Sequence, residues 1–94
     1  KNKKQRSKAE RAYTRLHRDA LSALPKQNFL AAASCTAQVS PDAFRETIAE
    51  GAKQAGCRVQ ILHEAGHALD HPVAAHFPEG RYLKFLLVRK YDLA

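Results

Sequence analysis

Apolar residues recur at helical spacing near the amino end of the chain. Intervals of three and four residues predict an amphipathic helix over residues 7–24, because such positions share one face of a helix. Pro25 ends this helix, since its ring disfavours helical geometry in the residue before it. The apolar stripe consists of Ala9, Ala12, Tyr13, Leu16, Ala20, Leu21 and Leu24.

A short run of small apolar residues follows the turn at residues 25–28. Its length and composition predict a strand over residues 29–36 that is buried on both faces. Layered α/β proteins bind their ligands at the carboxyl ends of such strands. Cys35 therefore lies at the end of the strand where chemistry is expected.

The next segment carries start and stop signals of a helix. Ser40 can cap the helix, Pro41 fits its first position, and Gly56 can end it. Asp42 and Glu46 suit the positive end of the helix dipole. The buried face of this helix is expected to contain Phe44, Ile48, Ala52 and Ala55.

Two more strands are predicted in the second half of the chain. Residues 57–61 alternate apolar with polar, which indicates a strand with one covered face and makes Cys57 a core residue. Residues 63–80 contain two glycines and two prolines and are expected to form an irregular connection with one short strand around Val73. Residues 81–89 have the composition of a central strand.

This order of elements predicts an α/β layered fold of about three strands and two main helices. Three strands and two helices are few for such a sheet, whose parallel strands need helices on both faces. We therefore expect residues 1–94 to be a single fragment, with a basic loop at residues 1–6 and a folded part at residues 7–94. Strands that the fragment lacks would come from its parent protein.

The charge of the chain favours a polyanionic partner, with nucleic acid as the first candidate. The net charge is +7, and Lys and Arg gain affinity by displacing counterions from phosphates. Alternatively, a basic fragment belongs to a protein whose other part is acidic. The candidate RNA-binding residues are Lys3, Lys4 and Arg6, and the first helix adds cations that contact either solvent or RNA, namely Lys8, Arg11, Arg15 and Arg18.

No apolar run reaches the roughly 18 residues of a membrane span, and the amino end lacks the apolar core of a secretory signal. We expect a soluble cytoplasmic protein with no membrane partner. Its two cysteines, Cys35 and Cys57, are expected to be reduced. On the residues alone, Cys35 is either a small buried hydrophobe or a nucleophile.

A second motif suggests different chemistry. His63-Glu64-Ala65-Gly66-His67 matches HExxH, in which two histidines one helical turn apart hold zinc and the glutamate activates water. His71 extends the spacing by four more residues, so His63, His67 and His71 are the alternative metal ligands. The motif needs a helix, however, and this segment follows a strand directly and soon meets Pro72, which weighs against a zinc hydrolase.

Three strings in order carry a family resemblance: Ser34-Cys35-Thr36, Asp70-His71-Pro72-Val73, and Pro78-Glu79-Gly80-Arg81-Tyr82-Leu83-Lys84. They resemble the carboxyl-terminal part of S-adenosylmethionine-dependent 23S ribosomal RNA (cytosine-5) methyltransferases of the large subunit methyltransferase I type. The family usually has proline-glycine-glycine before the serine-cysteine strand, whereas this chain has Pro25-Lys26-Gln27-Asn28. Asn28 tolerates positive φ better than most residues, and we expect it to preserve the turn.

The resemblance implies a fold, a reaction and a role for Cys35. The fold would be the carboxyl-terminal part of a Rossmann-like class I methyltransferase sheet whose last strand is antiparallel. The parent would use S-adenosylmethionine to form 5-methylcytosine in ribosomal RNA, with Cys35 adding to carbon 6 of the base. The HExxH match would be a coincidence. Most of the cofactor site would lie outside this chain, so the fragment alone is expected to be inactive. The fragment would associate with the rest of the parent protein. The parent could also form a homodimer. The remaining alternative is a basic RNA-binding module without catalysis.

Overall fold

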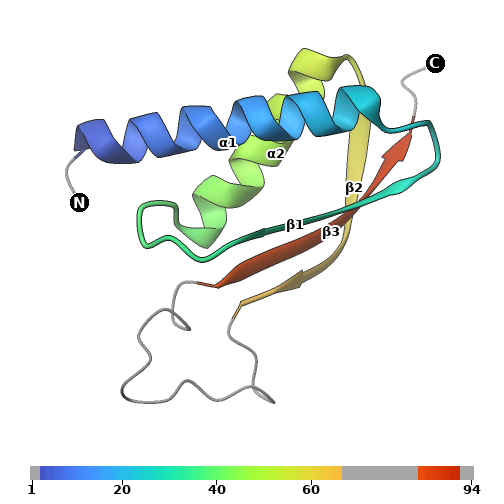
Figure 1. Cartoon of the computed structure of the whole chain (residues 1–94). Coiled ribbons are helices and arrows are strands. Elements are labelled where there is room, and N and C mark those ends of the chain that lie inside the picture. The colour runs from blue at the N-terminus through green and yellow to red at the C-terminus, as the bar shows by residue number, and fades with distance from the viewer. Residues whose placement is uncertain (1–2, 67–82, 92–94) are drawn as a thin grey trace.

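Two helices lie on one face of a three-stranded sheet (Figure 1). The computed structural model describes residues 3–66 and 83–91. The elements follow in the order α1 (Lys3–Ala23), β1 (Phe29–Ser34), α2 (Pro41–Ala55), β2 (Arg58–Ala65) and β3 (Lys84–Tyr91). β3 is central and pairs antiparallel with both neighbours, in the order β1-β3-β2. The predicted α/β class, two helices, central last strand and its antiparallel direction are confirmed.

The bounds of two predicted irregular segments, residues 1–6 and residues 63–80, need correction. α1 begins at Lys3, so the predicted basic loop is wrong for residues 3–6; lysine, glutamine and arginine are good helix formers and nothing there stops the helix. β2 continues to Ala65, so the irregular connection is wrong for residues 63–65. A register shift between Ile61 and His63 lets this extension pair with β3. The strand predicted around Val73 lies outside the described residues.

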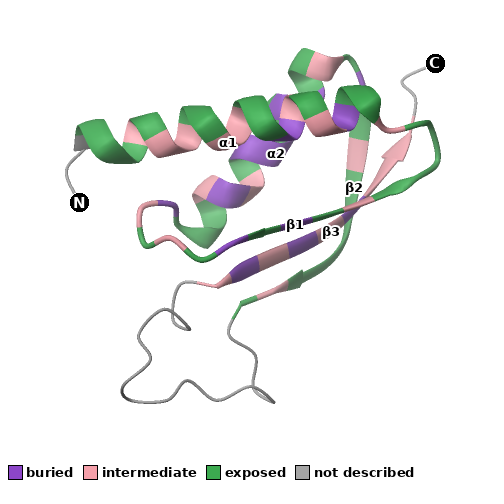
Figure 2. Cartoon of the chain, viewed as in Figure 1, coloured by how far each residue is buried: buried purple, intermediate pink, exposed green. Residues whose placement is uncertain are grey.

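β1 is buried on one face only, in contrast to the prediction. Ala32 and Ser34 are buried, whereas Ala31 and Ala33 are exposed and Phe29 is 57% exposed. The reason is the layering, because the helices cover one face of the sheet and no described residue covers the other (Figure 2). The run of small apolar residues concealed this alternation.

The residues that begin and end α2 are those predicted. The Ser40 side chain accepts a hydrogen bond from the Ala43 amide at 3.1 Å, Pro41 begins the helix, and Gly56 ends it with a φ of 74°. Phe44, Ile48 and Ala52 are buried, whereas Ala55 is only half-buried. The main core unites α2 with the covered face of the sheet through Ala32, Val39, Phe44, Ile48, Leu86 and Val88.

A second, smaller core holds the carboxyl end of α1. Leu21, Ala52 and Cys57 are buried together there, which confirms that Cys57 is a core residue. Within the described residues, neither helix is long and apolar enough to cross a membrane.

α1 is rotated from the expected orientation. Leu16 is 59% exposed, whereas its neighbour His17 is buried and forms edge contacts with Phe44. The helices approach closely at Gly51, where an added Cβ would lie 2.9 Å from the Arg18 amide nitrogen and 3.0 Å from the His17 Cβ. Because only glycine leaves room there, Gly51 brings His17 under α2, a tertiary effect that the apolar stripe does not encode.

The turn before β1 has positive φ at Gln27 (62°), so the prediction that Asn28 would shape the turn in this way is wrong. The Gln27 amide donates to the Lys90 carbonyl at 2.9 Å, and the Lys90 amide donates to the Asn28 carbonyl at 2.8 Å. These two bonds extend the β1–β3 ladder and dictate which residue takes the left-handed conformation.

Candidate active site

Cys35 directly follows β1, and its side chain is exposed and forms no disulfide. β1 stops at Ser34, after which the chain turns away from β3 and runs to the cap of α2. The thiol is thus presented at the carboxyl end of a strand, as the sequence predicts. Burial as a small hydrophobe, the other interpretation of Cys35, is wrong for this chain.

Side-chain hydrogen bonds fix the backbone on both sides of Cys35. The Ser34 hydroxyl lies 2.7 Å from the Tyr13 hydroxyl of α1 and accepts a bond from the Thr36 amide at 3.4 Å. The Thr36 hydroxyl in turn accepts from the Gln38 amide at 3.2 Å. Such local side-chain bonds stabilise turns. Val39, which is buried, anchors the far end of the loop.

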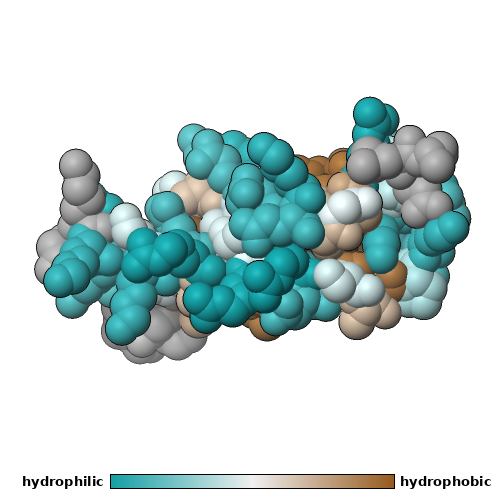
Figure 3. Space-filling model, turned by 90° about the horizontal axis from the view of Figure 1, so that it is seen from above, coloured by the Kyte–Doolittle hydropathy of each residue, from teal (hydrophilic) through white to brown (hydrophobic). Residues whose placement is uncertain are grey.

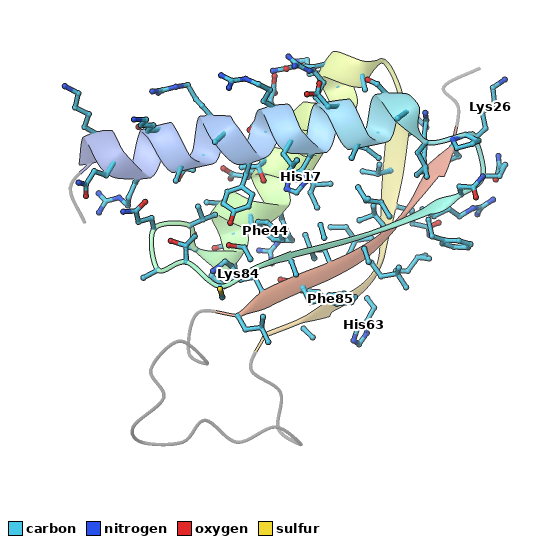
Figure 4. The ribbon with its side chains drawn as sticks, viewed as in Figure 1. His17, Lys26, Phe44, His63, Lys84 and Phe85 are labelled. Atoms are coloured by element: carbon cyan, nitrogen blue, oxygen red, sulfur yellow. The ribbon has the colours of Figure 1, made fainter. Side chains whose placement is uncertain are left out.

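Lys84 supports the same loop from β3. It lies opposite Ser34 in the strand register, is only 4% exposed, and donates from its Nζ to the Thr36 carbonyl at 2.8 Å. Figure 4 shows its side chain in the layer between the sheet and the helices. Burial lowers the pKa of Lys84, while its charge interaction with Cys35 acts in the opposite direction. The sequence pattern did not predict Lys84 as a site residue, although a lysine within the apolar strand at residues 81–89 is an unusual feature.

His17 is a second buried titratable group, one helical turn after Tyr13 on α1. Its ring stacks on Tyr13 with a centroid distance of 6.0 Å and meets Phe44 edge-on at 5.3 Å (Figure 4). Desolvation lowers the pKa of His17 to about 4, and its Nε2 has no hydrogen-bond partner among the described residues. At neutral pH the ring is therefore neutral and part of the apolar layer.

A small hollow adjoins Lys84. Its volume is about 220 Å³, and its walls are formed mainly by Pro41, Phe44, Glu64, Lys84 and Phe85. Ligand sites usually measure about 300–1,000 Å³. The hollow is therefore too small to be a complete site for a cofactor or a nucleotide.

His63 and Glu64 of the HExxH motif lie on the strand β2, whereas the zinc-binding form of the motif needs a helix. His63 lies on the sheet face away from the helices, with its ring centroid 6.4 Å from that of Phe85 (Figure 4). Glu64 forms an ion pair with Arg45. Within residues 3–66 and 83–91 no three potential ligands cluster. His67 and His71 lie outside the described residues, as does the whole Asp70-His71-Pro72-Val73 string.

The structure separates the candidate RNA-binding residues. Lys4 and Arg6 are both exposed on α1, and helical geometry places them on different sides of it. Lys3 is the first residue of the helix, and its side chain lies outside the described part. None of the three lies on the loop that carries Cys35.

Comparison with known proteins identifies relatives of the chain, although no protein-family model matches it. It is 38% identical over 88 residues to ribosomal RNA large subunit methyltransferase I of Tolumonas auensis, which covers 94% of this chain and 22% of that protein. The proteins of the same name from Shewanella amazonensis and Escherichia coli O9:H4 are 36% and 39% identical, over 94% and 88% of the chain and 22% and 21% of their own lengths. The chain thus spans about a fifth of these relatives. It is homologous to a segment of the ribosomal RNA large subunit methyltransferase I proteins, which confirms the resemblance inferred from its sequence.

Proposed function

We propose that this chain is part of an S-adenosylmethionine-dependent enzyme that forms 5-methylcytosine in large-subunit ribosomal RNA, with Cys35 as the nucleophile. The observation that carries the proposal is an exposed thiol at the end of β1 on a loop whose backbone is fixed on both sides. The names of the relatives support RNA methylation, which on this chain alone would be only one of several thiol chemistries.

The chemistry needs a thiolate because cytosine carbon 5 is a weak nucleophile. Addition of the Cys35 sulfur to carbon 6 forms an S–C bond and moves the electron pair of the 5,6 double bond onto carbon 5. S-adenosylmethionine would supply the methyl group to carbon 5, with S-adenosylhomocysteine as the leaving group. A base would then remove the carbon 5 proton. The 5,6 double bond then re-forms as the S–C bond breaks, which returns the thiolate.

Positioning is the contribution of the residues around Cys35. A nucleophile that must reach one carbon of a flat base gains rate from fixed geometry. Ser34 and Thr36 hold the backbone before and after Cys35, while Tyr13 and Lys84 secure those two residues to α1 and β3. We therefore assign Tyr13 and Lys84 to positioning, since neither is required to touch the base.

The described residues do not fit the methyl donor. A nucleoside cofactor in this kind of sheet is held by a glycine-rich turn between a strand and a helix. The described glycines lie elsewhere: Gly51 inside α2, Gly56 at its end, and Gly66 after β2. We propose that S-adenosylmethionine binds to other parts of a Rossmann-like parent domain and that this chain supplies the nucleophile.

The test is a pair of cysteine variants in the full-length protein. We expect Cys35→Ala to abolish methyl transfer and the covalent trapping of RNA that contains 5-fluorocytidine, because the fluorine at carbon 5 blocks release of the thiolate. Cys57→Ala is the matched control, since Cys57 lies in the core beside Leu21 and Ala52. It should keep both activities, with a circular-dichroism melt to confirm that it folds. Methyl transfer that survives in Cys35→Ala would show that the nucleophile is another residue.

A further inference from the structure

Five cations form a single row along α1. Lys4, Lys8, Arg11, Arg15 and Arg18 recur at intervals of four and three, which on a helix of 100° per residue places them within an arc of about 80°. The row extends about 21 Å along the helix axis. No other residue between 4 and 18 shares this arc, so no acidic or apolar side chain interrupts it. We call these five residues the basic row.

The basic row lies on the side of α1 away from the core. The opposite side of the helix carries Tyr13, His17 and Leu21, which pack on α2 and the sheet. Viewed from above the helices, the molecule presents mainly hydrophilic side chains (Figure 3). Because the apolar side fixes the rotation of α1, the row has a set direction in the folded protein.

Most of the positive charge in the row is not neutralised. Lys4, Lys8, Arg11 and Arg15 are exposed, and Lys8, Arg11 and Arg15 form no ion pair with any carboxylate of the described residues. Arg18 is half-buried and pairs with Asp19 at 2.9 Å. A groove of about 820 Å³ lies between this side of α1 and α2. Its charged lining consists of Glu10, Arg11, Arg15 and Arg18 from α1 and Glu46, Glu50 and Lys53 from α2. The groove therefore carries charges of both signs, and the arginines of the basic row form one edge of it.

We propose that the basic row binds the phosphate backbone of RNA without reading its sequence. Unpaired lysines and arginines in a line suit a polymer of regularly spaced phosphates, and arginine binds phosphate oxygens in a bidentate manner. A membrane surface fits less well, because a membrane-binding helix must insert its apolar side, and that side of α1 lies in the core. The choice of RNA as the polyanion rests on the proposed function, whereas the phosphate contact does not depend on Cys35.

The experiment compares two double variants with the same net charge in the full-length protein. Arg11→Gln/Arg15→Gln removes the middle of the row, whereas Lys26→Gln/Arg58→Gln removes two exposed cations outside the groove, from the turn before β1 and from β2. Binding to a fluorescein-labelled RNA duplex is measured by anisotropy over a range of salt concentrations. The row variant should bind about tenfold more weakly at low salt, and the slope of log K against log salt should become shallower by about 2. The control variant should stay close to the unmodified protein.

Two outcomes would overturn the proposal. Equal losses in both double variants would show that only net charge counts. A row variant that keeps RNA affinity but loses binding to phosphatidylserine vesicles would assign the row to a membrane. The anisotropy measurement tests only the basic row, and the methyl-transfer assay tests only the nucleophile, so a failure of one proposal is distinguishable from a failure of the other.

Discussion

At each end of the β1–β3 pair, a lysine side chain of β3 donates to backbone carbonyls, but the two lysines stabilise different kinds of structure. At one end, Lys84 donates to the Thr36 carbonyl beside Cys35. At the other end, Lys90 donates to the Leu21 and Leu24 carbonyls at 2.6 and 2.5 Å. Lys90 thus gives the Leu24 carbonyl a donor and adds a second donor to the Leu21 carbonyl, which also accepts from the Leu24 amide at 3.3 Å. A cation at this carboxyl end of α1 also suits the helix dipole. Lys84 instead fixes an irregular loop that carries an exposed thiol.

The two ends also differ in how many destabilising features they contain. The Cys35 end contains a deeply buried cation. His17, whose Nε2 has no partner among the described residues, lies on α1 midway between Tyr13 and Leu21, and so between the two ends. Buried polar groups of this kind reduce stability, and proteins concentrate them at functional sites. The end with Lys90 has strain only in the backbone of Gln27 and is otherwise well hydrogen-bonded. The difference supports a functional role for the Cys35 end and a structural role for the other end.

The largest expected effect is a pH dependence that comes from His17. Its pKa is about 4 in the folded chain, against 6.5 as the ordinary value. Between these values the unfolded chain binds a proton that the folded chain does not, so the free energy of unfolding falls as pH falls from about 6.5 towards 4. We expect a loss of about 2 kcal/mol, measured by urea unfolding at a series of pH values.

His17→Phe tests whether this pH dependence comes from His17. Phenylalanine keeps the contacts with Tyr13 and Phe44 but has no nitrogen to protonate. The variant should lose most of the acid-side slope, whereas replacement of the exposed His63 by glutamine should keep it. If the free energy of unfolding of His17→Phe still fell with pH as steeply as in the unmodified protein, His17 would not be the source of the pH dependence.

Next in size is the difference between the two lysines. Lys90→Met should lower the free energy of unfolding by about 1–2 kcal/mol, because the Leu24 carbonyl loses its Lys90 donor and the helix end loses a favourable cation. Lys84→Met should change it by less than about 1 kcal/mol, since the desolvation cost of the buried cation disappears together with its hydrogen bond. Amide hydrogen exchange at residues 36–38 should nevertheless quicken in Lys84→Met and not in Lys90→Met. A larger loss of stability in Lys84→Met would reverse the roles assigned to the two ends.

The smallest effect concerns Gln27. Glycine relieves positive φ, so Gln27→Gly should raise the free energy of unfolding by up to about 1 kcal/mol. The gain is reduced by loss of the side-chain hydrogen bond from Arg89. Gln27→Ala loses the same bond but keeps the strain, and should therefore be less stable than Gln27→Gly in the same urea titration. Equal stability of the two variants would show that this turn carries no strain.

The sequence predicted the elements well because their signals are local. Ser40, Pro41 and Gly56 mark the ends of α2, and each acts through the backbone within a few residues. It also placed Cys35 at the end of a strand. The sequence did not predict that buried and exposed residues alternate along β1. A run of small apolar residues has no polar positions to mark which face of the strand will be covered.

What the sequence determined by itself was the order of helices and strands, the caps of α2, the excess of positive charge and the homology to ribosomal RNA methyltransferases. Only the tertiary structure decided which residues surround Cys35. Tyr13 and Lys84 reach its loop from positions 21 and 48 residues away from their hydrogen-bond partners, and Gly51 determines that His17 instead of Leu16 faces inward. Local signals cannot specify such contacts, because they depend on how distant elements pack against each other.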